Sequence, residues 1–219
     1  MQDQDIHQVI PILRRQLESW QPALVDGMAE QHETTPYQIL IATILSLRTK
    51  DTLTAQIAPK LFALADNPQA MVRHSAETIA QLIYPVGFYR NKAKSILAIS
   101  HQLIADYGGQ VPDELDELLK LPGVGRKTAN LVLTAGFHKP GICVDVHVHR
   151  ISNRWGYVQT KTPEQTEFAL RKKLPQAYWL EYNALLVSFG QNLCTPVSPW
   201  CSRCPVAQFC DRVGVDRSR

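Results

Sequence analysis

The sequence has no apolar run long enough to cross a membrane. Its longest mostly apolar stretch, Tyr37–Leu47, is far shorter than the ~20 residues that a membrane helix needs. The N-terminal residues Met1–Asp5 carry two acids and no apolar segment, so we expect no signal peptide there. These absences predict a soluble, intracellular protein without a membrane partner.

An excess of charge of one sign is also missing. The chain has 23 Lys and Arg residues against 20 Asp and Glu residues, a formal net charge of +3. Binding to a polyanion would therefore need a local basic patch. Hydrophobic residues make up 45% of the 219 residues, which excludes a disordered chain and allows a sizeable core.

Strand pairs, internal repeats and low-complexity tracts are absent as well, whereas helix signals recur. Thr35 is an expected N-cap, Pro36 suits the first helical position, and Tyr37–Leu47 is apolar almost all round, which is typical of a buried helix. We expect further helices to start at Asn67–Pro68, Ser75 and the capping box Thr162–Gln165, and to cover Asn91–Tyr107, Asp113–Leu119 and Tyr178–Leu193. The predicted fold class is all-α.

Cysteine is scarce and unevenly placed. Of five cysteines, four lie in the last 26 residues as C-x6-C-x2-C-x5-C, at Cys194, Cys201, Cys204 and Cys210. In an intracellular chain such a compact cluster is more typical of metal binding than of disulfides. Zinc and a [4Fe–4S] cluster both accept four thiolates, and the single C-x2-C pair favours the iron–sulfur cluster. Four buried structural thiols are a third interpretation, which the prolines of this stretch disfavour because they indicate a loop.

A glycine-containing turn joins two predicted helices at LPGVGRKTA, residues 121–129. It is not a nucleotide-binding P-loop, because its glycines are only two apart, Lys127 follows Arg126, and a helix rather than a strand precedes it. Gly123 and Gly125 would let backbone amides at a helix N-terminus approach a phosphate of a nucleic-acid strand. A tight helix–helix corner without a ligand is the alternative.

LPGVGRKTAN, then VDVHVHR from Val144, then the terminal cysteine string resemble, in this order, the endonuclease III family of DNA glycosylases. This family belongs to the helix-hairpin-helix superfamily that carries a Gly/Pro-rich loop and a catalytic Asp. LSLRTKD at 45–51 and YPVGFYRNKA at 84–93 match further blocks of the family, so the resemblance covers almost the whole chain.

The resemblance implies a function in base excision DNA repair. The expected activity is that of a bifunctional DNA N-glycosylase and AP lyase, which removes oxidised pyrimidines and cleaves 3′ to the abasic site by β-elimination. The implied partner is double-stranded DNA that contains damaged pyrimidines or abasic sites, bound by a monomer. The implied location is the cytoplasm, in association with the nucleoid, for a bacterial or archaeal source, and otherwise the nucleus or mitochondrion.

The implied fold has two helical lobes. A six-helix barrel lobe with the helix-hairpin-helix motif is expected over residues 28–142. Residues 1–27 together with residues 143–219 would form a smaller helical lobe, in which the cysteines of the C-x6-C-x2-C-x5-C string hold a [4Fe–4S] cluster. The isolated Cys143 is expected to be a buried structural residue.

Two residues match the family's catalytic positions. Lys127 is the implied nucleophile, whose neutral amine attacks the sugar C1′ and forms a Schiff base; its alternative role is a phosphate contact. Asp145 is the implied second catalytic residue, a carboxylate that stabilises positive charge developing on the sugar. Asp145 is also expected to cap the helix that begins at Val146.

Contacts to DNA are implied for ten residues of the matched blocks. Five belong to the hairpin and five lie elsewhere: Leu121, Gly123, Val124, Gly125, Arg126, Arg48, Phe88, Arg90, Lys92 and His147. Four further cations, Lys94, Lys120, Arg150 and Arg154, are weaker candidates. His147 and His149 are expected to be packing or hydrogen-bonding residues rather than metal ligands.

Two of these positions lie in loops that the family inserts into the duplex. Phe88 occupies the place of an apolar wedge, with core packing beside Tyr84 and Tyr89 as its alternative. Arg48 stands where relatives commonly carry Gln. A guanidinium has five donors and no acceptor, so it favours the acceptor-rich edge of guanine over adenine. We therefore expect better processing of lesions that face guanine, unless Arg48 only holds a phosphate.

Overall fold

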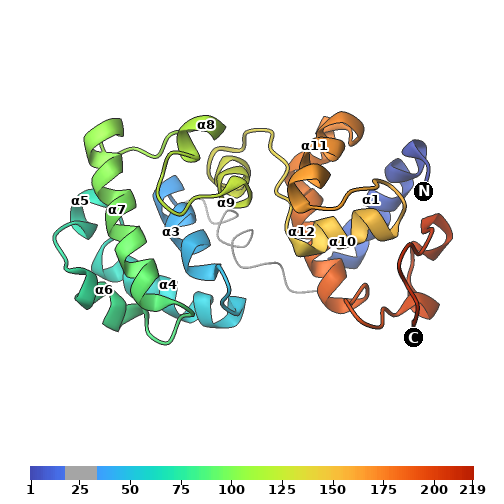
Figure 1. The fold of residues 1–219 in the computed structure, drawn as a ribbon, viewed down its shortest axis with the longest axis horizontal. Helices are drawn as coiled ribbons and strands as arrows, with labels where there is room; N and C mark the ends of the chain where they lie inside the picture. The colour runs from blue at the N-terminus through green and yellow to red at the C-terminus, as the bar shows by residue number, and fades with distance from the viewer. Residues whose placement is uncertain (18–33) are drawn as a thin grey trace. The chain divides into compact units, whose positions relative to one another are not determined.

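The computed structural model describes residues 1–17 and 34–219. Within these ranges the regular structure is helical and contains no strand, as Figure 1 shows, which confirms the predicted all-α class. None of the helices in the described ranges is both long and apolar enough to span a bilayer. The predicted lobe boundary at residues 27 and 28 lies outside the described residues.

The chain divides into two compact units. The first unit joins the N-terminal segment to Pro140–Arg219, and the second ends at Lys139. The lobe boundary that the resemblance implies, between residues 142 and 143, stays a prediction. The helices of the first unit are η1 (Asp3–Asp5), α1 (Ile6–Leu17), α10 (Val146–Arg154), α11 (Pro163–Lys173), η3 (Gln176–Tyr178), α12 (Trp179–Asn192), η4 (Cys201–Arg203) and η5 (Ala207–Phe209).

The core of the first unit forms where α1 meets helices from the other end of the chain. Ile6, Val9, Ile10 and Leu13 recur at helical spacing and are at most 1% exposed. They belong to one apolar cluster with residues of α10, α11 and α12, and with Val206 of the cysteine-containing stretch. The C-terminal loop is therefore part of the core of this unit.

The second unit is a set of helices around one apolar helix. Its elements are α3 (Pro36–Ser46), α4 (Asp51–Leu64), α5 (Pro68–Met71), α6 (Ala76–Ile83), α7 (Tyr89–Tyr107), α8 (Leu115–Leu118), α9 (Arg126–Leu131) and the π-helix η2 (Val132–Gly136). The central α3 contacts α4, α7, α9 and η2. Its residues Tyr37 and Ile39–Leu45 are buried, as an almost uniformly apolar helix requires.

Most predicted helix ends are found where local side chains encode them. Thr35 forms a complete capping box with Gln38, and Ser75 accepts the amide of Thr78. The box expected at Thr162 is incomplete: Thr162 accepts the amide of Gln165 at 3.2 Å, but the Gln165 side chain accepts from Lys161 instead of Thr162. The helix expected over residues 113–119 is shortened to the single turn α8.

Candidate functional site

The turn between α8 and α9 is built around glycine. Gly123 has a φ of +79°, in the left-handed region that glycine adopts without a steric penalty. The amide of Val124 donates to the carbonyl of Leu121 at 3.1 Å and closes the turn. Leu121 and Val124 are buried, whereas Gly123 and Gly125 are exposed. Two apolar side chains thus anchor the turn while its glycine backbone faces solvent.

The first turn of α9 presents backbone amides beside a cation. Gly125 is the N-cap and, being glycine, has no side chain that could accept from these amides. Because α9 runs directly into η2, residues 126–136 form one continuous helical segment. The N-terminus of such a segment carries partial positive charge, and the half-buried Arg126 adds a full charge beside it. This arrangement suits a phosphate.

Lys127 lies in the same first turn with an exposed side chain. The following residues Thr128–Leu131 are buried and give α9 its contact with α3. The helix therefore buries its Thr128–Leu131 stretch, while the Lys127 side chain is exposed.

Asp145 is the N-cap of α10, as predicted. Its Oδ1 accepts the backbone amides of His147 at 2.8 Å and Val148 at 2.9 Å. Both bonds use one oxygen, so within the described residues Oδ2 accepts no hydrogen bond. The carboxylate is thus held in one orientation with one oxygen left for another partner. Asp145 belongs to the first unit and Lys127 to the second.

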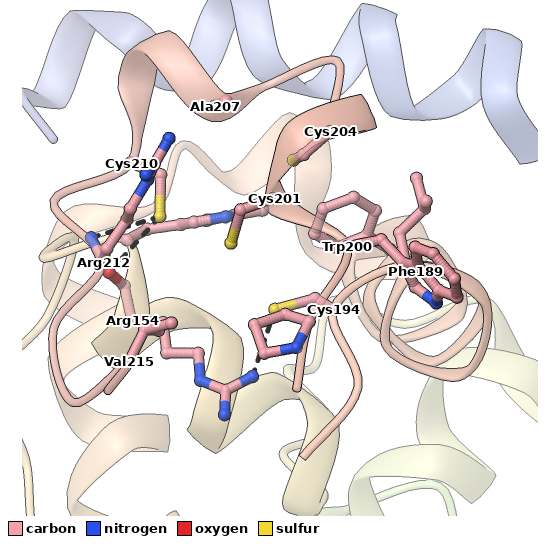
Figure 2. Close-up of a pocket in the computed structure, with 13 residues that line it drawn as sticks. Arg154, Phe189, Cys194, Trp200, Cys201, Cys204, Ala207, Cys210, Arg212 and Val215 are labelled. Carbon is pink, nitrogen blue, oxygen red and sulfur yellow. Dashed lines mark hydrogen bonds between the residues drawn. The ribbon is translucent and has the colours of Figure 1, made fainter. Parts of the chain in front are cut away.

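The four clustered cysteines line one pocket in the first unit. Their thiols are free and surround the pocket in Figure 2, together with Trp200, Phe189 and other residues. Burial is the main reason that the pKa of the Cys204 thiol is raised to about 11; a backbone hydrogen bond at Val206 opposes the rise and the other three thiols add to it. Burial also raises the pKa of Cys210. The thiolate forms of Cys204 and Cys210 therefore need stabilisation by positive charge or by hydrogen-bond donors.

Dashed lines in Figure 2 mark the hydrogen bonds at two of these sulfur atoms: two N–H groups donate to sulfur, and Cys210 Sγ donates to the carbonyl of Arg154 at 3.5 Å. Arg154 Nη1 donates to Cys194 Sγ at 3.5 Å, and the backbone amide of Arg212 donates to Cys210 Sγ at 3.3 Å. Such bonds favour anionic sulfur. In the described part of the chain, no three His, Cys, Asp or Glu side chains are drawn together tightly enough for one metal ion. The donor set itself, four thiols of which Cys194 and Cys210 accept from N–H groups, fits a thiolate-bound cluster.

Arg150 and Arg154 correct a prediction, because their head groups hold the cysteine loop. Arg154 is only 8% exposed and donates to the carbonyls of Thr195 and Pro196. Arg150 donates to the carbonyl of Cys194 at 3.0 Å. These guanidiniums donate hydrogen bonds to loop carbonyls, which have no partner from a helix or a strand. Neither side chain fits the DNA-contact role that the sequence suggested.

Arg48 and Phe88 lie together at the surface of the second unit. The Arg48 guanidinium is 5.6 Å from the centroid of the Phe88 ring, a cation–π contact. Phe88 is 60% exposed, which excludes the alternative that it packs in the core. Tyr84 is also exposed and forms an edge-to-face pair with Tyr89.

Lys92 is the second correction. It was expected to contact DNA, but it is only 7% exposed. Its ammonium donates to the carbonyls of Leu45 at 2.7 Å and Leu47 at 2.5 Å, and to Thr49 Oγ1 at 2.9 Å. An ammonium has three donors, so all of them are used within the chain. Desolvation lowers the pKa of this amine to about 8.

The histidines act as hydrogen-bonding residues, as expected. His147 Nδ1 pairs with Arg150 Nη2 at 3.0 Å, and His149 Nδ1 pairs with Thr166 Oγ1 at 2.7 Å. Cys143 is 1% exposed, which confirms that it is buried. The roles of His147 and Arg90 toward DNA stay predictions.

Sequence reasoning missed the packing positions of Lys92 and Arg154, although a signal was present. Lys92, Ile96, Ile99 and Leu103 recur at helical spacing and are all buried in α7. A lysine that continues an apolar stripe is therefore expected inside, with its ammonium bound to oxygen atoms. The partners of Lys92 are 43 to 47 residues away in the sequence, so spacing alone could not name them.

Comparison with known proteins yields consistent matches. The family model described as "HhH-GPD superfamily base excision DNA repair protein" matches residues 41–176. Endonuclease III of Thermotoga maritima is 50% identical over 179 residues, which cover 82% of this chain and 84% of that protein. The chloroplastic endonuclease III homolog 2 of Arabidopsis thaliana is 42% identical over 80% of this chain, which spans about half (47%) of that longer relative.

Among solved structures, a trapped endonuclease III–DNA covalent intermediate in an estranged-adenine complex has a similar fold. Its TM-score is 0.85 with 33% sequence identity, and the match covers 97% of each chain.

Proposed function

Because the chain belongs to the endonuclease III family of HhH-GPD base excision DNA repair proteins, we propose that it is a DNA glycosylase with AP lyase activity that acts on oxidised pyrimidines and abasic sites in duplex DNA. Base excision repair by such an enzyme follows from the family, and the lesion class and the residue roles are the proposal. The observation that supports the residue roles is the exposed side chain of Lys127, directly after a glycine turn suited to a phosphate.

In the proposed reaction Lys127 is the nucleophile. Its neutral amine attacks C1′ of the damaged nucleotide, the glycosidic C1′–N bond breaks, and the base leaves with a proton. The sugar ring opens to a Schiff base between Lys127 and C1′. Removal of a C2′ proton then breaks the C3′–O3′ bond by β-elimination, and water hydrolyses the imine to free the enzyme.

The turn before Lys127 supports this role by binding the backbone of the strand. Amides at the N-terminus of α9 and the Arg126 guanidinium would hold a phosphate. The exposed glycine backbone of Gly123 and Gly125 permits the close approach that such bonds require. These contacts position the strand and carry no base preference.

Asp145 is proposed to act on the same sugar by its charge. The bonds from the amides of His147 and Val148 hold Oδ1, so Oδ2 is available to face the reacting group. A carboxylate in this orientation stabilises the oxocarbenium-like charge that develops as the base leaves.

The cofactor proposed for the cysteine pocket is a [4Fe–4S] cluster. Cys194, Cys201, Cys204 and Cys210 would hold it through their thiolates. Burial disfavours the charged form of Cys204 and Cys210, and binding to a cluster would favour it. A cluster with four cysteine ligands would supply a structural cross-link of the loop and no open coordination position. The chain's own contribution is the pair of donors on the two outer sulfurs, from Arg154 and the Arg212 amide.

Purified protein should therefore be yellow-brown and contain about four iron atoms per chain. The expected measurements are broad visible absorbance and elemental analysis of the protein as isolated. One zinc atom per chain with no iron would show that the four cysteines bind zinc instead of a [4Fe–4S] cluster.

Borohydride trapping tests the proposed activity directly. A duplex with a single oxidised pyrimidine, incubated with wild-type protein and borohydride, should give a covalent protein–DNA complex, because reduction fixes the Schiff base. The same duplex with an undamaged pyrimidine is the matched control and should give none. Base release without any trapped complex would leave a glycosylase that uses water instead of an amine.

A further inference from the structure

The loops that carry Arg48 and Phe88, both within the described residues, are bonded to each other. Besides the cation–π contact, the amide of Gly87 donates to Thr49 Oγ1 at 3.2 Å. A Cβ on Gly87 would lie 2.7 Å from the Arg48 carbonyl oxygen, so only glycine permits this approach. Arg48 and Phe88 both have φ values in the left-handed region, +53° and +58°. Non-glycine residues keep this conformation only when their surroundings hold them there.

Lys92 binds the loop of Arg48 from inside. The carbonyls of Leu45 and Leu47 lie at the C-terminal end of α3, where helix carbonyls lose their intrahelical partners. The ammonium supplies those partners and places a cation at a helix C-terminus. Its third bond goes to Thr49 Oγ1.

The Thr49 hydroxyl joins the two loops to this lysine. It accepts from Lys92 Nζ and from the amide of Gly87, and it donates to the carbonyl of Leu47 at 3.4 Å. A hydroxyl has one donor and two acceptor lone pairs, so its capacity is fully used. Removing the hydroxyl breaks the hydrogen bond between the loops. Removing the ammonium takes away the bonds that hold this hydroxyl and the carbonyls of Leu45 and Leu47.

We propose that Lys92 is a positioning residue that, through Thr49, fixes the loops of Arg48 and Phe88 in one arrangement for insertion into the duplex. The inference rests on the proposed function, because it requires the two exposed side chains to enter the duplex opposite a flipped nucleotide. Lys92 itself touches no DNA. Its lowered pKa accords with a desolvated ammonium inside the unit.

The test compares two variants that both break the hydrogen bond between Lys92 and Thr49. Lys92→Met keeps the length of the side chain and removes its charge, and Thr49→Val keeps the shape and removes the hydroxyl. Lys60→Met, at an exposed lysine of the same unit, is the matched control. Thermal melts followed by circular dichroism establish that each variant is folded, and if Lys92→Met does not fold, Thr49→Val decides alone.

The first readout needs no catalysis. A duplex carries a tetrahydrofuran abasic analogue with 2-aminopurine as the opposite base, and the protein is added to saturation. Insertion of the loops unstacks the 2-aminopurine and raises its fluorescence. The fluorescence rise should be about twofold smaller for Lys92→Met and for Thr49→Val, and unchanged for Lys60→Met. The double variant of Lys92→Met and Thr49→Val should show the same reduced rise as each single variant, because both substitutions break the same bond.

The second readout separates insertion from chemistry. Single-turnover release of an oxidised pyrimidine should fall about tenfold or more in both variants, since small misplacements of positioning groups are costly. Strand cleavage at a preformed abasic site, which needs no base extrusion, should change far less. Equal losses in both reactions with an unchanged fluorescence rise would overturn the inference, as would wild-type behaviour of both variants. If wild-type protein releases no base, the proposed function fails, while the fluorescence comparison still tests the link.

Discussion

Lys127→Ala should form no borohydride-trapped complex with a duplex that wild-type protein traps. Alanine has no amine, so neither the Schiff base nor the β-elimination that follows from it can occur. Binding of the same duplex should weaken by no more than roughly fivefold, because the amides of the hairpin backbone remain and an exposed cation contributes about 1 kcal/mol or less. The two measurements are gel-resolved adduct yield and an equilibrium binding titration.

The contrast with Lys92 sharpens this prediction. The pKa of Lys92 is lowered to about 8, which favours a neutral amine, yet its Nζ is buried and bound to three oxygens. Lys127 is exposed. Access therefore selects Lys127 as the nucleophile, and Lys92→Met should still trap. If Lys127→Ala still formed the trapped complex and Lys92→Met did not, Lys92 would be the nucleophile and the assignment of Lys127 would be wrong. Lys60→Met serves as the neutral control.

Features that depend on neighbouring residues could be predicted from the sequence. An N-cap needs a short polar side chain two or three positions before the amides it accepts. Thr35, Ser75 and Asp145 meet this condition, and all three cap helices. The hairpin follows from local signals too, because Gly123 takes the positive φ that the turn requires.

Features that depend on long-range partners could not be predicted. Arg154 looks like a surface cation in the sequence, and only the fold brings its guanidinium to the carbonyls of Thr195 and Pro196. The position of a charged residue can be predicted only when its buried stem and the partners of its charged group are both known. A single sequence indicates at most the buried stem. The functional roles of Lys127 and Asp145 came from family resemblance, since spacing alone shows only a cation beside a turn and an acid before a helix.

Asp145→Asn separates the two roles that the geometry gives to this side chain. Asparagine is as good an N-cap as aspartate, and its amide oxygen can accept the same amides of His147 and Val148 that Oδ1 accepts. The helix α10 should therefore stay capped, and the melting temperature should remain close to that of the wild type. The negative charge is lost, so we expect base release in single turnover to slow by about 10²-fold, or about 2.7 kcal/mol in activation free energy.

Two further substitutions make the result decisive. Asp145→Ser restores a capping hydroxyl without charge and should behave like Asp145→Asn in both rate and stability. Asp145→Ala removes cap and charge together, so it should show the same slow base release and also lose about 1 kcal/mol of stability, or about 2–4 °C in Tm for a chain of this size. Capping alone predicts the opposite pattern, in which the rate follows the melting temperature across the series. If Asp145→Asn released base at the wild-type rate, Asp145 would be a helix cap and the charge would act from another residue.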